Sequence, residues 1–314
     1  MEKVAQDGPA ISWKTIFICL YPCFGGILFG YDSGYINGAL NIDQFKHDYG
    51  TPGHAVEVAA PGGYLYSDAQ KSLIVSILSA GTFIGALTAG YFADCLGRRL
   101  TIQIGCIIYT IGVILQMAVA SVAFLAAGRG VAGVGVGFVS ATVIMYVSEI
   151  APKKIRGTLV SCYQFSITIG LLLAAAVAYA AKDLMNSGAY RILIGLQFLW
   201  ALTLGGGLLL LPESPRWYVM KARKEKAEKA LAKIRSLDVN DPFVKQEYAD
   251  LVDSHRKDVG DGEGGWIECF QGRLKGGSNL RRTLLGMTIQ MMQQLSKLDT
   301  SPRNGYWLTD LKLV

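Results

Sequence analysis

The stretch TLVSCYQFSITIGLLLAAAVAYAA, residues 158–181, contains no charged side chain from end to end. The hydrocarbon core of a bilayer is about 30 Å thick, and roughly 20 apolar helical residues are needed to cross it. This stretch has that length, and its apolar residues surround the helix instead of forming one stripe. It therefore predicts a membrane-spanning helix.

Five further stretches have the same character, with few charges in each. They are residues 16–40, 72–93, 100–120, 123–147 and 192–211. A seventh, residues 283–296, has about two thirds of the required length and predicts a partial span. The composition agrees, because 51% of the residues are hydrophobic and only 17% are charged. A soluble protein would need amphipathic helices, so we predict an all-α membrane protein with a six-helix lobe at residues 16–211.

Lysine and arginine are unevenly distributed over the connections, and this predicts the orientation. Lysine and arginine gather in the connections at 94–99 and 152–157 and in the long polar segment at 212–282. The few charged residues of 41–70 are mainly acidic. Basic connections face the cytoplasm, so residues 1–15 and the 212–282 linker are expected inside the cell. The amino terminus has no small-residue cleavage site, so we expect the first span to be retained. The net charge of +6 then reflects topology and does not predict nucleic-acid binding.

Within the polar linker, residues 217–235 predict one charged helix. Lysine and glutamate are interleaved there with Val219, Ala227, Ala230, Leu231 and Ile234. The resulting apolar edge suits a helix that lies on a membrane surface or against other helices.

Cysteine and histidine patterns predict neither a metal site nor an enzyme. Four of the six cysteines lie in spans, where they act as small packing residues. Cys95 and Cys269 are expected in the reducing cytoplasm, so no disulfide is predicted. His47, His54 and His255 lack a nucleophile or acid partner at a recognisable spacing. We expect no cofactor either.

Small residues recur every four positions in the first two spans. The first span has Gly26, Gly30, Gly34 and Gly38, and the second has Gly81, Gly85 and Ala89. This spacing lets helix backbones approach closely in lipid. At about 100° per residue, the first stripe lies opposite Asp32. The first span is therefore expected to pack on glycine and to turn Leu28, Phe29, Asp32, Tyr35 and Ile36 toward an aqueous cavity.

Asp32 and Arg129 are the conspicuous charges inside spans. Each costs about 2.5–3.5 kcal/mol at mid-membrane on insertion scales, and such residues usually mark function. A carboxylate and a guanidinium can form a paired hydrogen bond, and burial makes the proton affinity of the acid sensitive to geometry. A proton-coupling pair is one interpretation. A static ion pair that aligns two helices is the alternative, and Arg129 can also extend to an interface.

Two further patterns each have two interpretations. Ser161, Gln164 and Thr168 share one face of the fifth span, where an amide can bind the hydroxyl groups of a polyol or hold helices together. Gly128, Gly130 and Gly133 match a dinucleotide-binding fingerprint. They lie inside an apolar span without the preceding strand that this motif requires, so nucleotide binding is not predicted.

Four motifs identify a family. GYFADCLGRR (residues 90–99) resembles the G-x-x-x-D-x-x-G-R-R signature of the major facilitator superfamily. FGYDSGYINGAL (29–40), YVSEIAPKKIRG (146–157) and PESPRW (212–217) narrow the resemblance to its sugar-porter family, and to fungal monosaccharide transporters most of all. The resemblance covers residues 16–296. It implies two lobes of six helices, each built from two inverted three-helix repeats, that rock about a central sugar site in the plasma membrane.

The resemblance also implies roles for single residues. Asp32 and Arg129 match the proton-coupling pair of the family's symporters, which favours sugar and proton symport. Candidate sugar ligands are Phe29 and Gln164, joined in the seventh segment by Gln293 and Gln294 of the QQLS motif. A gating charge network is implied on the cytoplasmic side. Its members are Asp94, Arg98, Arg99, Glu149, Arg156, Glu213 and Arg216, with partners expected partly on the second lobe.

After Ser296 the sequence departs from the family pattern. The family continues with Gly-Ile-Asn, whereas this chain has Lys297, Leu298 and Asp299 and a divergent tail at 297–314. We therefore expect a truncated chain without helices eight to twelve, through a frameshift, mis-splicing or an early stop, and transport incompetence unless another chain supplies the second wall of the cavity. A sugar sensor and an interaction partner of a full-length transporter are the alternatives, and an inositol remains open as the substrate.

Overall fold

The computed structural model describes residues 12–52, 64–118, 121–181, 184, 186–260 and 279–298. Most of the 1–15 segment, His54, Cys269 and nearly all of the divergent tail lie outside these residues. The chain divides into two compact units, residues 1–251 and residues 252–314.

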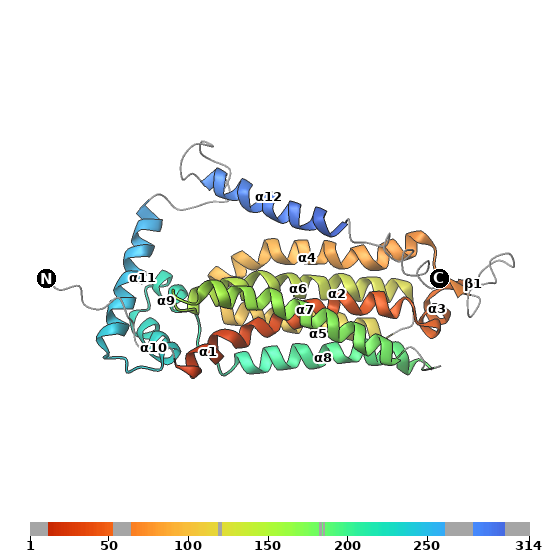
Figure 1. The fold of residues 1–314 in the computed structure, drawn as a ribbon, viewed down its shortest axis with the longest axis horizontal. Helices are drawn as coiled ribbons and strands as arrows, with labels where there is room; N and C mark the ends of the chain where they lie inside the picture. Colours follow the sequence, from red (N-terminus) through yellow and green to blue (C-terminus); the bar gives the residue numbers. More distant parts are fainter. Residues whose placement is uncertain are drawn as a thin grey trace, which may run out of the picture. The chain divides into compact units, whose positions relative to one another are not determined.

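Among the described residues, the helices that are long and apolar enough to cross a membrane all lie in the first unit (Figure 1). The first of these crossings is made by α1 (Trp13–Leu20), a 3-10 turn (Tyr21–Phe24) and α2 (Gly25–Ala39), and the others are α4 (Asp68–Leu96), α5 (Arg98–Ala118), α6 (Val122–Ile150), α7 (Arg156–Ala181) and α8 (Gly188–Leu208). The predicted six spans are confirmed among the described residues. Several helices extend beyond the predicted apolar stretches, because helical turns of polar residues precede or follow those stretches. For example, Ser67 and Gln70 form a capping box at the start of α4.

The spanning helices pair in a pattern that repeats. α2 packs on α7, α4 packs on α6, α5 packs on α6 and on α8, and α2 also contacts α8. If the first three crossings are matched in order with the last three, the α4–α6 pair corresponds to the α7–α2 pair. The α5–α6 pair likewise corresponds to the α8–α2 pair. This arrangement fits the two three-helix repeats implied by the resemblance, because α5 and α8 meet each other at the pseudo-symmetry axis.

Glycine forms the closest helix contacts in both repeats. A Cβ added at Gly30 would lie 2.1 Å from the carbonyl oxygen of Ile167 on α7, and one at Gly85 would lie 2.3 Å from that of Val134 on α6. No side chain fits at either position without a backbone shift. The predicted packing role of the two glycine stripes is therefore confirmed, and it accounts for the α2–α7 and α4–α6 pairs.

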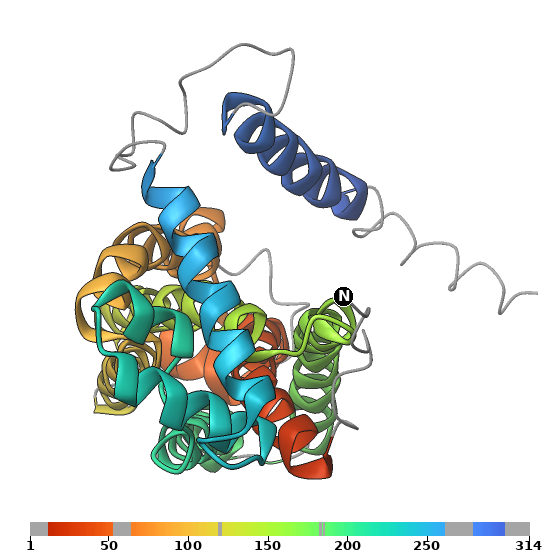
Figure 2. The same ribbon diagram turned by 90° about the vertical axis from the view of Figure 1, so that its left-hand side faces the viewer.

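Short elements cover both ends of the helices. At one end, α3 (Asp43–Tyr49) precedes the two-residue strands β1 (Thr51–Pro52) and β2 (Tyr64–Leu65), which pair antiparallel. At the other end lie α9 (Pro215–Met220) and α10 (Lys224–Arg235), which are nearest the viewer in Figure 2 together with α11 (Pro242–Gly260).

The prediction of one continuous helix at 217–235 is wrong. The chain breaks between α9 and α10, where Ala222 has a φ of 52°, because the α9 end turns back through hydrogen bonds from Lys221, Ala222 and Arg223 to carbonyls of α9. The predicted apolar edge is present, since Ala227, Ala230, Leu231 and Ile234 are buried.

The second unit contains α12 (Asn279–Leu298), which covers the predicted partial span. Its apolar part, Thr283–Met292, is shorter than a membrane crossing requires. The leucine, isoleucine and methionine side chains described along it are exposed.

Candidate functional site

A buried polar cluster lies between α2, α5 and α6. Asp32 and Tyr35 come from α2, Tyr109 and Gln116 from α5, and Arg129 from α6; none is more than 1% exposed. These side chains meet because α2 turns its glycine face to α7 and therefore turns the opposite face into the lobe. We call these five residues the Asp32 cluster.

Tyr35 is the central hydrogen-bonding group of the Asp32 cluster. Its hydroxyl accepts from Arg129 Nη1 at 2.8 Å and donates to Gln116 Oε1 at 2.5 Å. The guanidinium also lies 5.4 Å from the centre of the Tyr35 ring, a distance at which a cation is attracted to the ring face. Arg129 Nε donates to the carbonyl of Ile74 on α4 at 2.7 Å. Arg129 is therefore held by two helices besides its own.

Asp32 has fewer partners than its burial requires. Oδ1 accepts from the Tyr109 hydroxyl at 3.4 Å, and Oδ2 has no hydrogen-bond partner among the described residues. An ionised carboxylate out of contact with water is stable only when it is well paired. The position therefore favours a carboxyl group whose protonation depends on how closely its neighbours approach.

Two sequence expectations about Asp32 need correction. Leu28, Asp32, Tyr35 and Ile36 do not face an aqueous cavity, since each is 2% exposed or less and lies inside the lobe. Nor do Asp32 and Arg129 form a direct ion pair among the described contacts, because Arg129 is held by Tyr35 and Asp32 is bonded to Tyr109. The physical reason is that the tyrosine rings fill the space between the helices.

Sequence reasoning missed Tyr109 and Gln116 as members of the cluster. Gln116 lies seven positions after Tyr109, about two helical turns. An amide and a phenol on one face of an otherwise apolar span are a signal that could have identified them.

The candidate sugar ligands occupy different surroundings. Phe29 on α2 is half-buried against the core. Gln164 on α7 is exposed, as are Ser161 and Thr168 on the same face. The α7 face thus presents polar groups at the surface of the lobe, and it is not used to hold the six helices together. Gln293 and Gln294 belong to α12, but their side chains lie outside the described residues.

Most of the predicted gating charge network is brought together at the α9 end of the lobe. Arg98 Nη2 lies 3.0 Å from Glu149 Oε1, and Arg98 Nη1 lies 3.1 Å from Asp94 Oδ1. Ser214, which the sequence did not single out, donates its hydroxyl to Glu149 Oε2. The Arg98 guanidinium is only 4% exposed, so it is shielded from water while it joins α5 to α4 and α6.

Glu213 caps the amino-terminal end of α5 from a distant part of the chain. Its carboxylate accepts from the backbone N–H groups of Arg98 and Arg99 at 3.0 and 3.1 Å. A carboxylate at a helix amino terminus satisfies N–H groups that have no partner in the helix. The preceding Gly97 has a φ of 103°, and a Cβ there would lie 2.5 Å from Glu213 Oε2. Only glycine fits this turn.

Burial raises the pKa of Glu213, and the backbone hydrogen bonds from Ser214, Arg99 and Arg98 offset only part of that effect. The other two predicted members are Arg156 and Arg216. Arg156 Nη2 donates to the carbonyl of Ala151 at 3.4 Å, and Arg216 is exposed on α9. The described acidic partners of Arg98 are on this lobe, and further network partners on a second lobe stay a prediction.

The match to known proteins covers nearly the same residues as the four motifs predicted. A family model described as "Sugar (and other) transporter" matches residues 18–298. The chain is 42% identical to the major facilitator-type transporter ecdD of Aspergillus rugulosus, over 92% of this chain and 52% of that protein. It is 43% identical to the probable glucose transporter rco-3 of Neurospora crassa, over 91% and 47%. It is 36% identical to the high glucose sensor RGT2 of Saccharomyces cerevisiae, over 91% and 36%.

Solved structures of a sugar transporter resemble this chain in fold. The proton:xylose symporter XylE bound to 6-bromo-6-deoxy-D-glucose has a TM-score of 0.67 at 26% identity, covering 80% of this chain and 55% of that one. A partially occluded inward-open conformation of XylE from E. coli has a TM-score of 0.65 at 27% identity, covering 78% and 60%. The chain spans about half the length of the curated transporters it matches.

Proposed function

The chain belongs to the sugar transporter family of the major facilitators, and from that premise we propose that it serves the transport of a monosaccharide, a hexose or a pentose, by proton symport with alternating access. The observation that carries the proposal is the buried Asp32, whose Oδ2 has no hydrogen-bond partner within the described parts of the chain. Proton:xylose symport is the activity named for the structural relative XylE.

The proposed proton site is the Asp32 cluster. A carboxyl that is only weakly hydrogen-bonded in a water-free interior can be ionised or neutral depending on small movements of a nearby cation. Arg129 is that cation, held by Tyr35 and Ile74. A shift of α2 relative to α6 would change the distance between the two charges and would thereby load or release the proton.

The proposed sugar site is the polar face of α7 near α2. Gln164 is exposed there beside Thr168, and an amide can both donate to and accept from sugar hydroxyl groups. Phe29 is the further ligand that we propose in this unit. For Gln293 and Gln294 of α12, in the second unit, we propose a role in sugar binding from their QQLS motif alone. A half-buried aromatic ring together with amide groups suits a neutral polyol.

The proposed gate is the network around Arg98. We place it on the cytoplasmic side, with the amino terminus in the cytoplasm and the chain in the plasma membrane. This orientation is supported by the excess of lysine and arginine in the connections next to the network. Movement of one lobe against another requires two lobes, so we propose that sugar flux needs a second six-helix lobe, either in the same polypeptide or from another transporter chain.

The test uses this chain joined to the second lobe of the Neurospora relative. Asp32→Asn should abolish uphill sugar uptake driven by a proton gradient while exchange of labelled sugar continues, because only the coupling step needs the acid. Asp43→Asn, which removes a half-exposed carboxylate from α3, is the control and should accumulate sugar as before. If Asp32→Asn accumulates sugar normally, Asp32 is not the coupling group.

A second candidate is sugar sensing without transport. The 36% identity to the high glucose sensor RGT2 favours it. The same uptake experiment separates the two functions, because a sensor would bind labelled sugar without any exchange.

A further inference from the structure

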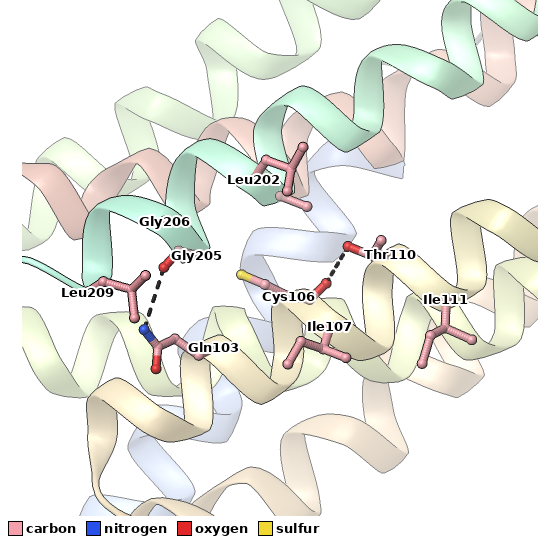
Figure 3. Close-up of a pocket in the computed structure, with 10 residues that line it drawn as sticks. Gln103, Cys106, Ile107, Thr110, Ile111, Leu202, Gly205, Gly206 and Leu209 are labelled. Atoms are coloured by element: carbon pink, nitrogen blue, oxygen red, sulfur yellow. Dashed lines mark hydrogen bonds between the residues drawn. The ribbon is translucent and has the colours of Figure 1, made fainter.

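A groove runs along the outside of the lobe between α5 and α8. Its volume is about 480 Å³, and its lining includes Gln103, Cys106 and Ile107 from α5, Leu202 and Gly205 from α8, and Leu209 directly after α8 (Figure 3). The groove plays no part in the proposed sugar or proton sites.

The groove exists because α8 has no side chains where it faces Cys106. A Cβ added at Gly206 would meet nothing within 4 Å, and one at Gly205 would lie 3.5 Å from Cys106 Cβ. The walls are apolar and open, since Ile107, Leu202 and Leu209 are each more than 60% exposed. In a spanning segment such a surface needs an apolar occupant, because water is absent from the bilayer core.

One end of the groove is cationic. Arg99 lies one helical turn before Gln103 on α5, and its Nη1 and Nη2 donate to the carbonyls of Leu211 and Leu209 at 3.1 Å. Lys233 of α10 donates to the carbonyl of Leu210 at 3.0 Å. Both cations are therefore held where α8 ends, next to Leu209 in the groove wall.

These two cations have no acidic partner among the described residues. No carboxylate oxygen in that part of the chain lies within 4.0 Å, the limit for an ion pair, of the Arg99 guanidinium or the Lys233 ammonium group. Arg99 Nε has no hydrogen-bond partner there either. Guanidinium and ammonium groups beside an apolar groove complement a ligand with an anionic headgroup attached to an alkyl chain.

We propose that this groove binds an anionic phospholipid of the adjacent leaflet, with one acyl chain between α5 and α8 and the phosphate at Arg99 and Lys233. The chain would cover Ile107 and Leu202, and Gln103 would mark the boundary between the acyl and head regions. The proposal does not depend on the transported substrate.

The experiment uses the purified chain in detergent with phosphatidylserine that carries a photoreactive diazirine in its acyl chain. Cross-linked peptides are located by mass spectrometry, and phosphatidylcholine with the same acyl chain is compared. We expect phosphatidylserine to label residues of the α5–α8 groove more than other spanning surfaces and more than phosphatidylcholine does.

Variants then test the two parts of the site separately. Gly206→Leu fills the groove and should lower this labelling by about tenfold. Gly195→Leu is the matched control, because Gly195 is also on α8 with nothing within 4 Å of an added Cβ, and it should not lower labelling. Lys233→Gln should remove most of the preference for phosphatidylserine while leaving acyl labelling in place.

Several outcomes would overturn the proposal. They are even labelling around all spanning helices, equal labelling by the two lipids, and normal labelling of Gly206→Leu with an unchanged thermal midpoint. Competition by soluble glycerophosphoserine at equal concentration would show a phosphate site without an acyl site. Cross-links between two copies of the chain through these residues would show a dimer interface instead.

Discussion

Tyr35 decides how the charge of Arg129 is accommodated inside the lobe. Its hydroxyl both accepts from the guanidinium and donates to Gln116, so one oxygen atom links three helices. Removing it would leave a buried donor and a buried acceptor unpaired, which costs about 1–3 kcal/mol for each group.

Tyr35→Phe should therefore lower the thermal unfolding midpoint of the purified lobe by several degrees. Tyr163→Phe is the control, because Tyr163 is also buried in a spanning helix but its hydroxyl has no partner among the described residues. The measurement is a thermal scan of both variants in the same detergent. Equal midpoints for the two variants would contradict the role of Tyr35.

Glu213 should make the folding stability depend on pH, and the direction of that dependence follows from its pKa. Because burial raises its pKa in the folded protein, protonation favours folding. The contribution is fully present below the unfolded pKa, about 4.3, and it is lost as pH rises through the folded value. Glu213→Gln resembles the protonated acid, so it should flatten this part of a plot of thermal midpoint against pH. An unchanged slope in Glu213→Gln would show that other groups cause the dependence.

At the scale of elements, α2 and α7 are joined by backbone contact. Gly30→Ala places a methyl group 2.1 Å from the Ile167 carbonyl, and overpacking of this kind costs about 1–3 kcal/mol or more. Gly195→Ala has open space and should be neutral. We expect Gly30→Ala to reduce the yield of folded, monodisperse protein in size-exclusion chromatography, while Gly195→Ala matches the parent. Normal yield from both would mean that the helices can separate without cost.

The helix α3 is fixed by Asp48. Tyr190 of α8 donates to Asp48 Oδ2 at 2.9 Å, and Phe45, Tyr49 and Tyr190 pack ring against ring. Burial raises the pKa of Asp48, but hydrogen bonds involving His47, Tyr190 and Gln44 outweigh it, so the net pKa is lowered. The stabilisation is therefore present above the unfolded pKa and lost as pH falls through the folded value.

Asp48→Asn should speed protease cleavage near α3 at pH 7 and have little effect once the pH lies below the folded pKa of Asp48. Asp43→Asn is the matched control, since Asp43 is on α3 but half-exposed and pairs with Lys46. Cleavage rates by limited proteolysis give the comparison. Faster cleavage in Asp43→Asn than in Asp48→Asn would contradict the assignment.

At the scale of the whole molecule, the six spanning helices pack on one another within the first unit. Each repeat pairs with the other through glycine, and the Arg98 network includes Glu149 and Ser214 of the same lobe. The predicted fold class is confirmed by the likeness to XylE.

The polypeptide of these 314 residues, purified and placed in liposomes, should pass labelled glucose no faster than empty vesicles. The same chain joined to the second lobe of a relative should show saturable uptake, because alternating access moves one lobe against the other. Saturable uptake by the 314-residue polypeptide without a second lobe would refute the proposed requirement.

The sequence by itself determined the spans, the family and the close contacts of glycine, because these depend on apolar length and on short motifs that act locally. It placed Asp32 and Arg129 inside the membrane for the same reason. Only the tertiary structure decided that Arg129 bonds to Tyr35 and Asp32 to Tyr109, and that Glu213 caps a helix that begins 115 positions earlier. Those contacts depend on which faces of distant helices meet, and side-chain spacing within one segment does not specify that.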